Sequence, residues 1–375
     1  MLYERDNSFD ARAQGYGLTL QQASKAIAGL GIPKLKQGII STKHVVHTPD
    51  GAVIGEWGLR KWRGDDVPKN SKRKNIHIAR QSLRSELLER LQEGGYVKWN
   101  HAFINFSENQ QGSIDLNFQV DGEVKTTVAD LVVGADGIRS SVRSELIDEK
   151  ATPLEYLGCI VVLGICSLES LSNRDNSLLD SATVFQTVNG YERIYMMPYD
   201  INSIMWQFSV PMSEQEAKTL NKQGPGTMKK EILKRLQNWH DPIPEIIEAT
   251  NESDITGYPV YDRDVLDQRL LQPHQDITLI GDAAHPMSPF KGQGANQAIL
   301  DALSLVRGIS EKCGPDSDWR EIGLRDTVLT EFEKEMLDRT ASKVQSSREA
   351  ARVLHTDAVL HPGNKPRGRG LKISL

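Results

Sequence analysis

The sequence predicts a mixed α/β fold, and three segments support this prediction. Ile277–Ile280 is a short apolar run that suits a buried strand, and a loop and an apolar helical stripe follow it. A second apolar run, Leu131–Val133, leads through a glycine-containing turn to serines that suit a helix start. Between these runs, residues 154–262 contain several segments rich in β-branched and aromatic residues, as strands are. We therefore expect strands alternating with helices, together with a separate β-sheet region.

The bulk properties narrow the class of protein. The 375 residues suffice for two or three domains, and the formal net charge of −5 argues against nucleic acid as a partner. No apolar run is long enough to span a bilayer and no signal peptide is evident, so we expect a cytoplasmic protein without a membrane span. The three cysteines lack metal-binding spacing, and we predict no metal.

The segment after residue 280 carries the strongest indication of a ligand site. Gly281 allows a close turn past a ligand, and Asp282 then lies at the carboxyl end of a strand, where open α/β sheets bind ligands. The carboxylate can accept hydrogen bonds from a polyol or ribose. Pro289, Gly292 and Gly294 shape the loop, and the helix start near residue 295 offers N–H groups to an anion. A tight strand–loop–helix connection without a ligand is the alternative interpretation.

Three segments together resemble the class A flavoprotein monooxygenases, the aromatic hydroxylases related to 4-hydroxybenzoate hydroxylase, salicylate hydroxylase and the tetracycline-inactivating monooxygenases. Residues 281–296 contain Gly-Asp followed by Pro, Gly and Asn, residues 131–143 contain Gly-Ala-Asp-Gly, and residues 2–18 begin with Leu-Tyr-Glu-Arg. The resemblance covers nearly the whole chain. It implies a Rossmann-like FAD-binding domain, an interleaved β-sheet substrate domain and C-terminal helices.

The resemblance also implies roles for individual residues. Asp282 corresponds to the aspartate that holds the ribityl chain of FAD, and Glu4 to the acid that binds the adenosine ribose. Arg80 corresponds to an arginine that reaches the cofactor at the head of a helix, and a solvated helix charge is the alternative. The Gly-Ala-Asp-Gly segment supports FAD and NAD(P)H docking in the family, although a structural turn explains it about as well. The other implied cofactor positions are Arg12, Asp136, Gly137, Gly281, Pro289, Gly292, Gly294 and Asn296.

The chemistry implied by the resemblance belongs mainly to the cofactor. In the family, NADPH or NADH reduces FAD, the reduced flavin takes up O₂, and a C4a-hydroperoxide transfers one oxygen atom to an electron-rich ring. This implies a flavoprotein hydroxylase of secondary metabolism that acts on an aromatic or polyketide-like small molecule, as a monomer or a homodimer. No catalytic side chain is predicted, and His285 is expected to order its turn. A relative that uses FAD for epoxidation, ring opening or dehydrogenation is an alternative.

The sequence departs from the family pattern at its start. The family's glycine loop, G-x-G-x-x-G, is expected about 20 residues before the ribose-binding acid, and Glu4 leaves no space for it. We therefore expect a FAD-binding domain that is truncated at its N-terminus. A truncated, non-catalytic paralogue or an incomplete gene product with impaired FAD binding is the alternative to an active monooxygenase.

The predicted organisation divides the chain into four regions. Residues 1–36, 58–150 and 263–315 are assigned to the FAD-binding domain, and residues 37–57 and 151–262 to the substrate-binding sheet. Residues 316–358 are predicted as C-terminal helices and residues 359–375 as a flexible tail. Large side chains on the predicted strands of the substrate sheet either form ordinary core or face an apolar substrate cavity. These candidates are Tyr195, Met197, Met205, Trp206 and Phe208.

Overall fold

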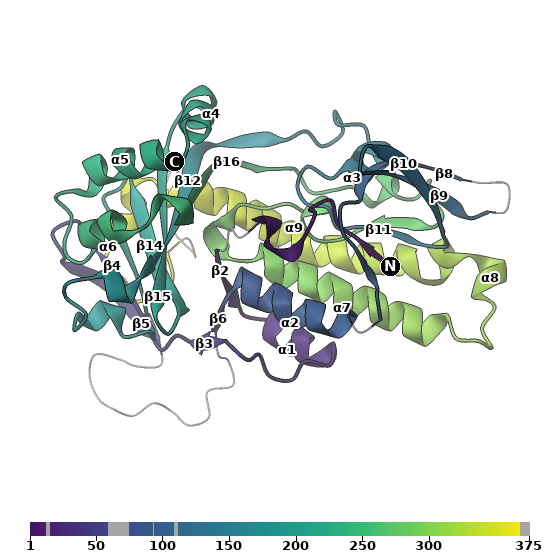
Figure 1. Ribbon diagram of the computed structural model, residues 1–375, viewed down its shortest axis with the longest axis horizontal. Coiled ribbons are helices and arrows are strands. Elements are labelled where there is room, and N and C mark those ends of the chain that lie inside the picture. Colours follow the sequence, from purple (N-terminus) through teal and green to yellow (C-terminus); the bar gives the residue numbers. More distant parts are fainter. Residues whose placement is uncertain (13–15, 59–74, 93, 109–111, 368–375) are drawn as a thin grey trace.

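The computed structural model describes residues 1–12, 16–58, 75–92, 94–108 and 112–367. Figure 1 shows two parts side by side. One is a large sheet with short helices on the side that faces away from the second part, and the other is a region of smaller sheets and longer helices. Strands and helices alternate over much of the chain, so the predicted mixed α/β class is confirmed.

The larger sheet contains seven strands in the order β16–β12–β15–β14–β13–β4–β5. Neighbouring strands are antiparallel except for β13 and β4, which are parallel. Two strands from residues 43–58 thus join five strands from residues 155–262. The strands are β4 (Lys43–His47), β5 (Val53–Gly58), β12 (Glu155–Ser167), β13 (Thr183–Val188), β14 (Arg193–Asp200), β15 (Ser203–Pro211) and β16 (Ile255–Asp262).

Side chains alternate along these strands and give the larger sheet two faces. The outer face, which includes Ile194, Met196 and Trp206, packs against three short helices in one apolar core. The inner face, which includes Met197 and Met205, is turned toward the rest of the molecule. The three helices are α4 (Glu214–Gln223), which begins with a capping box, α5 (Pro225–Leu236) and α6 (Ile243–Ala249).

The parallel strands of the second part form two separate pairs. β1 pairs with β7, and β11 pairs with β17, so the two apolar runs that were predicted as strands lie side by side. Two long helices, α7 and α9, pack with β11 and β17 in one apolar core. The elements are β1 (Leu2–Tyr3), β7 (Val97–Lys98), β11 (Val132–Gly134), β17 (Ile277–Leu279), α7 (Gly294–Lys312) and α9 (Thr330–Val353).

Two small antiparallel sheets complete this part. The sheet β2–β6–β3 contacts β14 of the larger sheet and thereby connects the two parts. The sheet β10–β9–β8 is an antiparallel meander of three consecutive strands. The remaining elements are β2 (Gly17–Leu20), β3 (Ile39–Ile40), β6 (Ile76–Ala79), β8 (Ala102–Glu108), β9 (Ile114–Val120), β10 (Glu123–Ala129), α1 (Ala23–Gly29), α2 (Arg80–Gln92), α3 (Ser141–Leu146) and α8 (Trp319–Ile322).

The end of the described chain packs against the larger sheet. The Gly363 N–H donates to the Ile54 carbonyl at 2.9 Å, and the Glu56 N–H donates to Asn364 Oδ1 at 3.1 Å. The prediction of a flexible tail is therefore wrong for residues 359–367. The reason is that β5 is an edge strand, whose free backbone groups can bind another segment. Residues 368–375 lie outside the described part.

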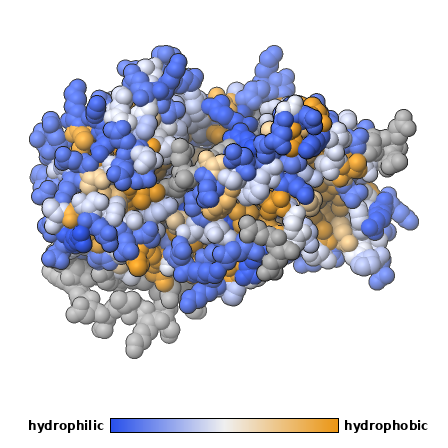
Figure 2. Space-filling view, in the orientation of Figure 1, coloured by the Kyte–Doolittle hydropathy of each residue, from blue (hydrophilic) through white to orange (hydrophobic). Residues whose placement is uncertain are grey.

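The surface in Figure 2 is largely hydrophilic, with hydrophobic residues exposed over the middle and right of the view. Exposed apolar side chains include those of Leu2 on β1 and Ile40 on β3. Across the described ranges, no helix combines the length and the apolar character needed to cross a membrane.

Candidate cofactor site

The turn after β17 presents Asp282 at the surface. Gly281 has a φ of +59°, a left-handed conformation that favours glycine, and a Cβ there would lie 3.1 Å from Ala298 Cβ. Asp282 is exposed, whereas the flanking Gly281 and Ala283 are buried. Among the described residues, no hydrogen bond is made to the Asp282 carboxylate. The turn thus holds a carboxylate that is free to accept hydrogen bonds from a ligand.

Arg80 brings a positive charge near this carboxylate. It is the first residue of α2, and its guanidinium lies 5.6 Å from the centre of the Tyr16 ring. The Asp282 side chain is accessible to solvent, but many protein atoms surround its carboxylate beyond the first contacts. This desolvation raises the pKa of Asp282, and the charge of Arg80 opposes the rise. Asp282 in turn contributes to the raised pKa values of Tyr16 and Tyr258, so the four side chains surround one region.

The loop before α7 places backbone N–H groups that lack a side-chain cap beside Asp282. Gly292 has a φ of +57°, and a Cβ at Gly294 would lie 3.4 Å from Asp282 Oδ1. Gln293 makes no capping hydrogen bond through its side chain at the start of α7. The first turn of this helix therefore presents N–H groups that can bind an anion. Pro289, another predicted site residue, begins a 3₁₀ turn in the same loop.

Asn296 has a structural role in this loop. Its Oδ1 accepts hydrogen bonds from the N–H groups of Gln21 and Ala23, at 2.8 and 3.2 Å. Its Nδ2 donates to the carbonyls of Thr19 and Gly292, at 2.8 and 2.9 Å. The buried amide thus ties the start of α1 and the end of β2 to the loop, and these backbone contacts use its hydrogen-bonding capacity.

A buried ionic cluster lies behind the Gly281 turn. Asp301 on α7 accepts hydrogen bonds from the Gly281 N–H at 2.9 Å, from His285 Nε2 at 2.6 Å and from Arg339 at 2.8 Å. Burial alone would raise the pKa of Asp301, but the hydrogen bonds from these donors outweigh it and lower the pKa. The carboxylate therefore stays charged and fixes the turn to α7 and α9.

The Gly-Ala-Asp-Gly segment is built mainly as a helix cap. Asp136 accepts a hydrogen bond from the Ser141 N–H at 2.7 Å at the start of α3, and Gly137 has a φ of +86°. From the same helix, Arg143 donates to the Ala283 carbonyl at 2.8 Å. The structural interpretation of the segment therefore has direct support, and the segment reaches the Asp282 turn through Arg143.

The N-terminal candidates are only partly placed. Glu4 directly follows β1, and its carboxylate accepts a hydrogen bond from the Asp6 N–H at 3.2 Å. Glu4 thus lies at the end of a strand that pairs in parallel with β7. The side chain of Arg12 lies outside the described part of the chain.

Three of the predicted substrate residues share the inner face of the larger sheet. Met197 pairs with Met205 across β14 and β15, and Tyr195 lies two residues earlier on the same face. The Gly17 N–H points to Met205 Sδ at 3.0 Å, and the Thr19 hydroxyl lies 3.9 Å from Met197 Sδ. The two methionines therefore lie where the larger sheet meets β2.

Trp206 and Phe208 occupy the outer face, and the prediction that they line a substrate cavity is wrong. Both are fully buried in the core formed with α4, α5 and α6. Trp206 Nε1 donates to Thr250 Oγ1 at 2.9 Å. The strand period of two residues places them opposite Met205, and three helices cover their side of the sheet.

Comparison with known proteins now decides the family. Residues 61–315, more than half of the chain, match the sequence family described as FAD binding domain. The chain belongs to the class A FAD-dependent monooxygenases.

Individual relatives show how far this likeness extends. The aurachin C monooxygenase/isomerase of Stigmatella aurantiaca is 32% identical over 186 residues, which are 48% of this chain and 43% of that protein. The 3-amino-4-hydroxybenzoate 2-monooxygenase of Streptomyces cremeus is 26% identical over 66% of this chain and 55% of that protein. The matched region spans about half the length of these two relatives. HpxO from Klebsiella pneumoniae, solved with FAD and uric acid, shares the fold at a TM-score of 0.74 and 19% identity, over 94% of this chain and 82% of that chain.

The residues that fix the turn at Gly281 and Asp282 from its buried side were not predicted from the sequence. Asp301 lies on the buried face of α7 together with Gln297 and Leu305, outside the apolar stripe that the sequence indicates for this helix. Arg339 lies 38 positions further along the chain and left no signal of its own. Tyr258 on β16, which lies near Asp282, was not singled out from the sequence either.

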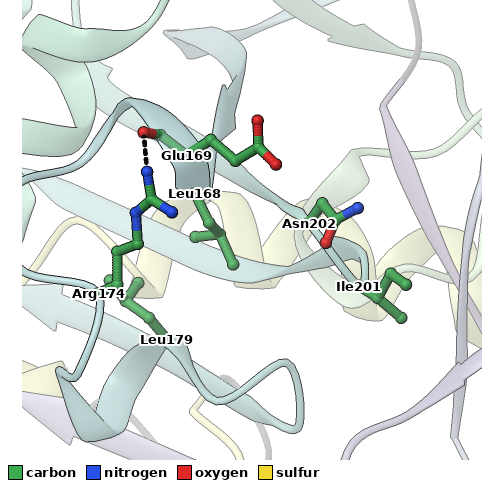
Figure 3. A pocket seen from close by; sticks show the side chains of 6 residues that line it. All are labelled: Leu168, Glu169, Arg174, Leu179, Ile201 and Asn202. Carbon is green, nitrogen blue, oxygen red and sulfur yellow. Dashed lines mark hydrogen bonds between the residues drawn. The ribbon is translucent and has the colours of Figure 1, made fainter.

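A separate hollow lies at the far end of the larger sheet. It has a volume of about 240 Å³, and the Arg174 guanidinium donates to the Glu169 carbonyl at its wall. Figure 3 shows its six lining residues, none of which is a predicted cofactor or substrate residue. The hollow is therefore distinct from the region around Asp282.

Proposed function

We propose that this protein is a FAD-dependent monooxygenase that uses NADPH or NADH and O₂ to hydroxylate an aromatic small molecule. The observation that carries the proposal is the Asp282 carboxylate. It is exposed and lacks a hydrogen-bond partner in the described part of the chain, and it lies beside the uncapped start of α7. A ligand that combines hydroxyl groups with a ring able to carry negative charge suits both features.

The residues present fit FAD in this region. Asp282 would accept hydrogen bonds from the ribityl hydroxyls, and Arg80 would supply positive charge at the head of α2. Gly292 and Gly294 leave space where side chains would obstruct a flat ring. The bound FAD supplies the redox chemistry, while the protein orients the ring and excludes water.

The names of the relatives support a ring substrate. One relative is named for 3-amino-4-hydroxybenzoate and another for 6-hydroxynicotinate, and both molecules are aromatic carboxylates with a ring hydroxyl. We infer that the substrate of this chain is a planar ring that lies between the inner face of the larger sheet and the loop of Pro289.

Binding of FAD to the purified protein tests the proposal. Flavin fluorescence quenching should show saturable binding, and Asp282→Ala should weaken it roughly 10- to 100-fold, as expected for hydrogen bonds to a charged group. Asp338→Ala, an exposed acid paired with Lys334, serves as the matched control and should bind FAD as the wild type does.

Turnover separates the enzyme from a binding protein. The FAD-loaded protein should oxidise NADPH or NADH faster with a suitable aromatic substrate, and mass spectrometry should find a product with one added oxygen atom. Saturable FAD binding without stimulated oxidation by any tested ring would support a non-catalytic paralogue. Absence of FAD binding would overturn the proposal.

A further inference from the structure

The inner face of the larger sheet is covered where the substrate ring is proposed to bind. Met197 and Met205 are only 2% and 3% exposed. Phe290, which directly follows Pro289, packs against the same apolar cluster. A ring that binds between the sheet and this loop must therefore pass a segment that moves away and then closes again.

Phe290 also connects the inner face with the C-terminal segment, residues 357–367. Its side chain packs against a second apolar cluster, which includes the partly buried Trp57 and Leu360. Val359 belongs to this second cluster and is fully buried. Residues from the C-terminal segment and from the loop before α7 thus share one apolar cluster beside the proposed position of the ring.

The other elements around this position are held by buried contacts. Strands β14 and β15 each have a hydrogen-bonded strand on both sides. In the loop before α7, the buried Ser288 hydroxyl donates to the Ser347 carbonyl of α9 at 2.5 Å. Asp301 holds the N–H of the Gly281 turn. Moving any of these elements would break hydrogen bonds that are shielded from water, which is costly.

Beyond its apolar start, the C-terminal segment is held along the edge of β5 by contacts near the surface. Gly363 donates to the Ile54 carbonyl at 2.9 Å, and Arg367 donates to the same carbonyl at 3.1 Å. The exposed Asn364 accepts a hydrogen bond from the Glu56 N–H at 3.1 Å. Residues 357–367 contribute no strand to the larger sheet, so the segment can leave β5 while the strand pairs stay intact. Segments held in this way open at low cost in local unfolding.

We propose that the C-terminal segment is a gate, which leaves the edge of β5 to let an aromatic substrate pass Phe290 and then returns. This inference rests on the proposed function, which places the ring beside the inner face. Burial of Val359 and Leu360 favours the closed position, in which the segment excludes water from the reaction. A gate that covers the site without touching the ligand controls how fast a ligand enters and leaves. It does not change the affinity, because it stabilises the free and the bound protein equally.

The test measures binding rates when the contacts of the segment are removed. FAD-loaded protein is mixed rapidly with 6-hydroxynicotinate or 3-amino-4-hydroxybenzoate, and binding is followed by the flavin absorption spectrum. The double variant Asn364→Ala, Arg367→Ala loses two side-chain contacts to β5. Its association and dissociation rates should both rise about tenfold, as expected for the loss of two hydrogen bonds, while Kd changes less than about threefold.

A second variant and a matched control accompany the double variant. Gly55→Ala acts from the sheet side, because a Cβ there would lie 2.3 Å from the Gly363 carbonyl oxygen, and it should also raise both rates. Lys365→Ala changes an exposed side chain of the same segment and should keep the rates of the wild type. Thermal unfolding and FAD affinity of each protein show whether the fold and the cofactor site survive.

The possible outcomes separate the gate from the proposed function. Unchanged rates in folded variants that bind FAD and a ring would overturn the gate alone. A weaker affinity without faster exchange would also overturn it, since that result indicates direct contact with the ligand. If neither ring binds to any FAD-loaded protein, the gate and the ring site are both refuted, whereas absence of FAD binding refutes the proposed function itself.

Discussion

His285 Nε2 lies 2.6 Å from Asp301 Oδ2, and both side chains are buried. The same carboxylate also holds the Gly281 N–H and Arg339. One acid on α7 therefore fixes the turn that presents Asp282 and links it to the C-terminal helix.

Replacing this acid should destabilise the protein and weaken FAD binding together. Asp301→Asn removes the negative charge that His285 and Arg339 share, and breaking such a buried pair costs about 3 kcal/mol. Urea unfolding with and without FAD measures both effects. Asp338→Asn, in an exposed pair with Lys334, should change stability by less than about 0.5 kcal/mol. Equal stability of the two variants would contradict this view of the cluster.

Asn296 should matter for the fold more than for ligand contact. Asn296→Ala leaves the backbone groups of Gln21, Ala23 and Thr19 without their partner, and an unfolding free energy lower by about 2 to 4 kcal/mol is expected. Denaturant titration of the FAD-free protein measures this loss. Asn251→Ala, which removes an exposed amide, should be nearly neutral. If Asn296→Ala altered only FAD affinity, the structural role would be refuted.

Variants of Trp206 and Met205 should distinguish effects on stability from effects on ligand binding. Trp206→Phe loses the hydrogen bond to Thr250 on the outer face and should cost about 1 to 3 kcal/mol, with FAD and ring binding unchanged. Met205→Leu conserves side-chain volume and should lower the unfolding free energy by less than about 1.5 kcal/mol. It alters the inner face of the larger sheet, beside which the ring is proposed to bind. Chemical denaturation and ligand titration of both variants give the comparison. Weaker ring binding in a stable Trp206→Phe protein would speak against the face assignment.

The contact between β5 and the C-terminal segment can be tested at Gly55. A Cβ at this position would lie 2.3 Å from the Gly363 carbonyl oxygen, so Gly55→Ala should displace the segment from the edge of the sheet. Arg367, which donates to the Ile54 carbonyl at 3.1 Å, should then become a faster site of tryptic cleavage. Gly314→Ala, with no heavy atom within 4 Å, is the control. Cleavage rates read by mass spectrometry that match in both variants would argue against the contact.

Buried histidines should make the fold sensitive to mild acid. Burial lowers the pKa of His77 to about 3 and that of His44 to about 4, from the ordinary value of 6.5. The unfolded chain therefore binds more protons between pH 6.5 and about 4, so this stability is present above pH 6.5 and is lost as the pH falls. His77→Asn should flatten the dependence of unfolding free energy on pH in this window. The contribution of Asp301, whose pKa is lowered, is lost only below about pH 3.8. An unchanged slope in His77→Asn would disprove the assignment.

Local patterns predicted the parts of the site that local chemistry builds. Asp282 and Gly281 were predicted correctly as a strand-end turn because an apolar run, a glycine and an acid follow one another directly. The face of each sheet residue was harder to predict. Trp206 was misplaced because its face depends on which side the helices cover, and α4 and α6 were not foreseen.

Contacts between distant segments could not be predicted from one sequence. Asp301 and Arg339 lie on different helices, and neither shows a local sign of the other. The docking of Asn364 on β5 depends on β5 being an edge strand, which only the complete strand order reveals. The types of residue indicated which chemistry the site could support. Which distant residues contact one another depended on the three-dimensional arrangement.

The alternation along β14 and β15 has a practical consequence for engineering. Along each of these strands, side chains on the inner face, which would contact a ligand, alternate with side chains on the outer face, which pack against the covering helices. A mutant library aimed at new ligands thus needs to randomise only every second residue, starting from Arg193. The interleaved positions can be kept constant, so most members of such a library should still fold.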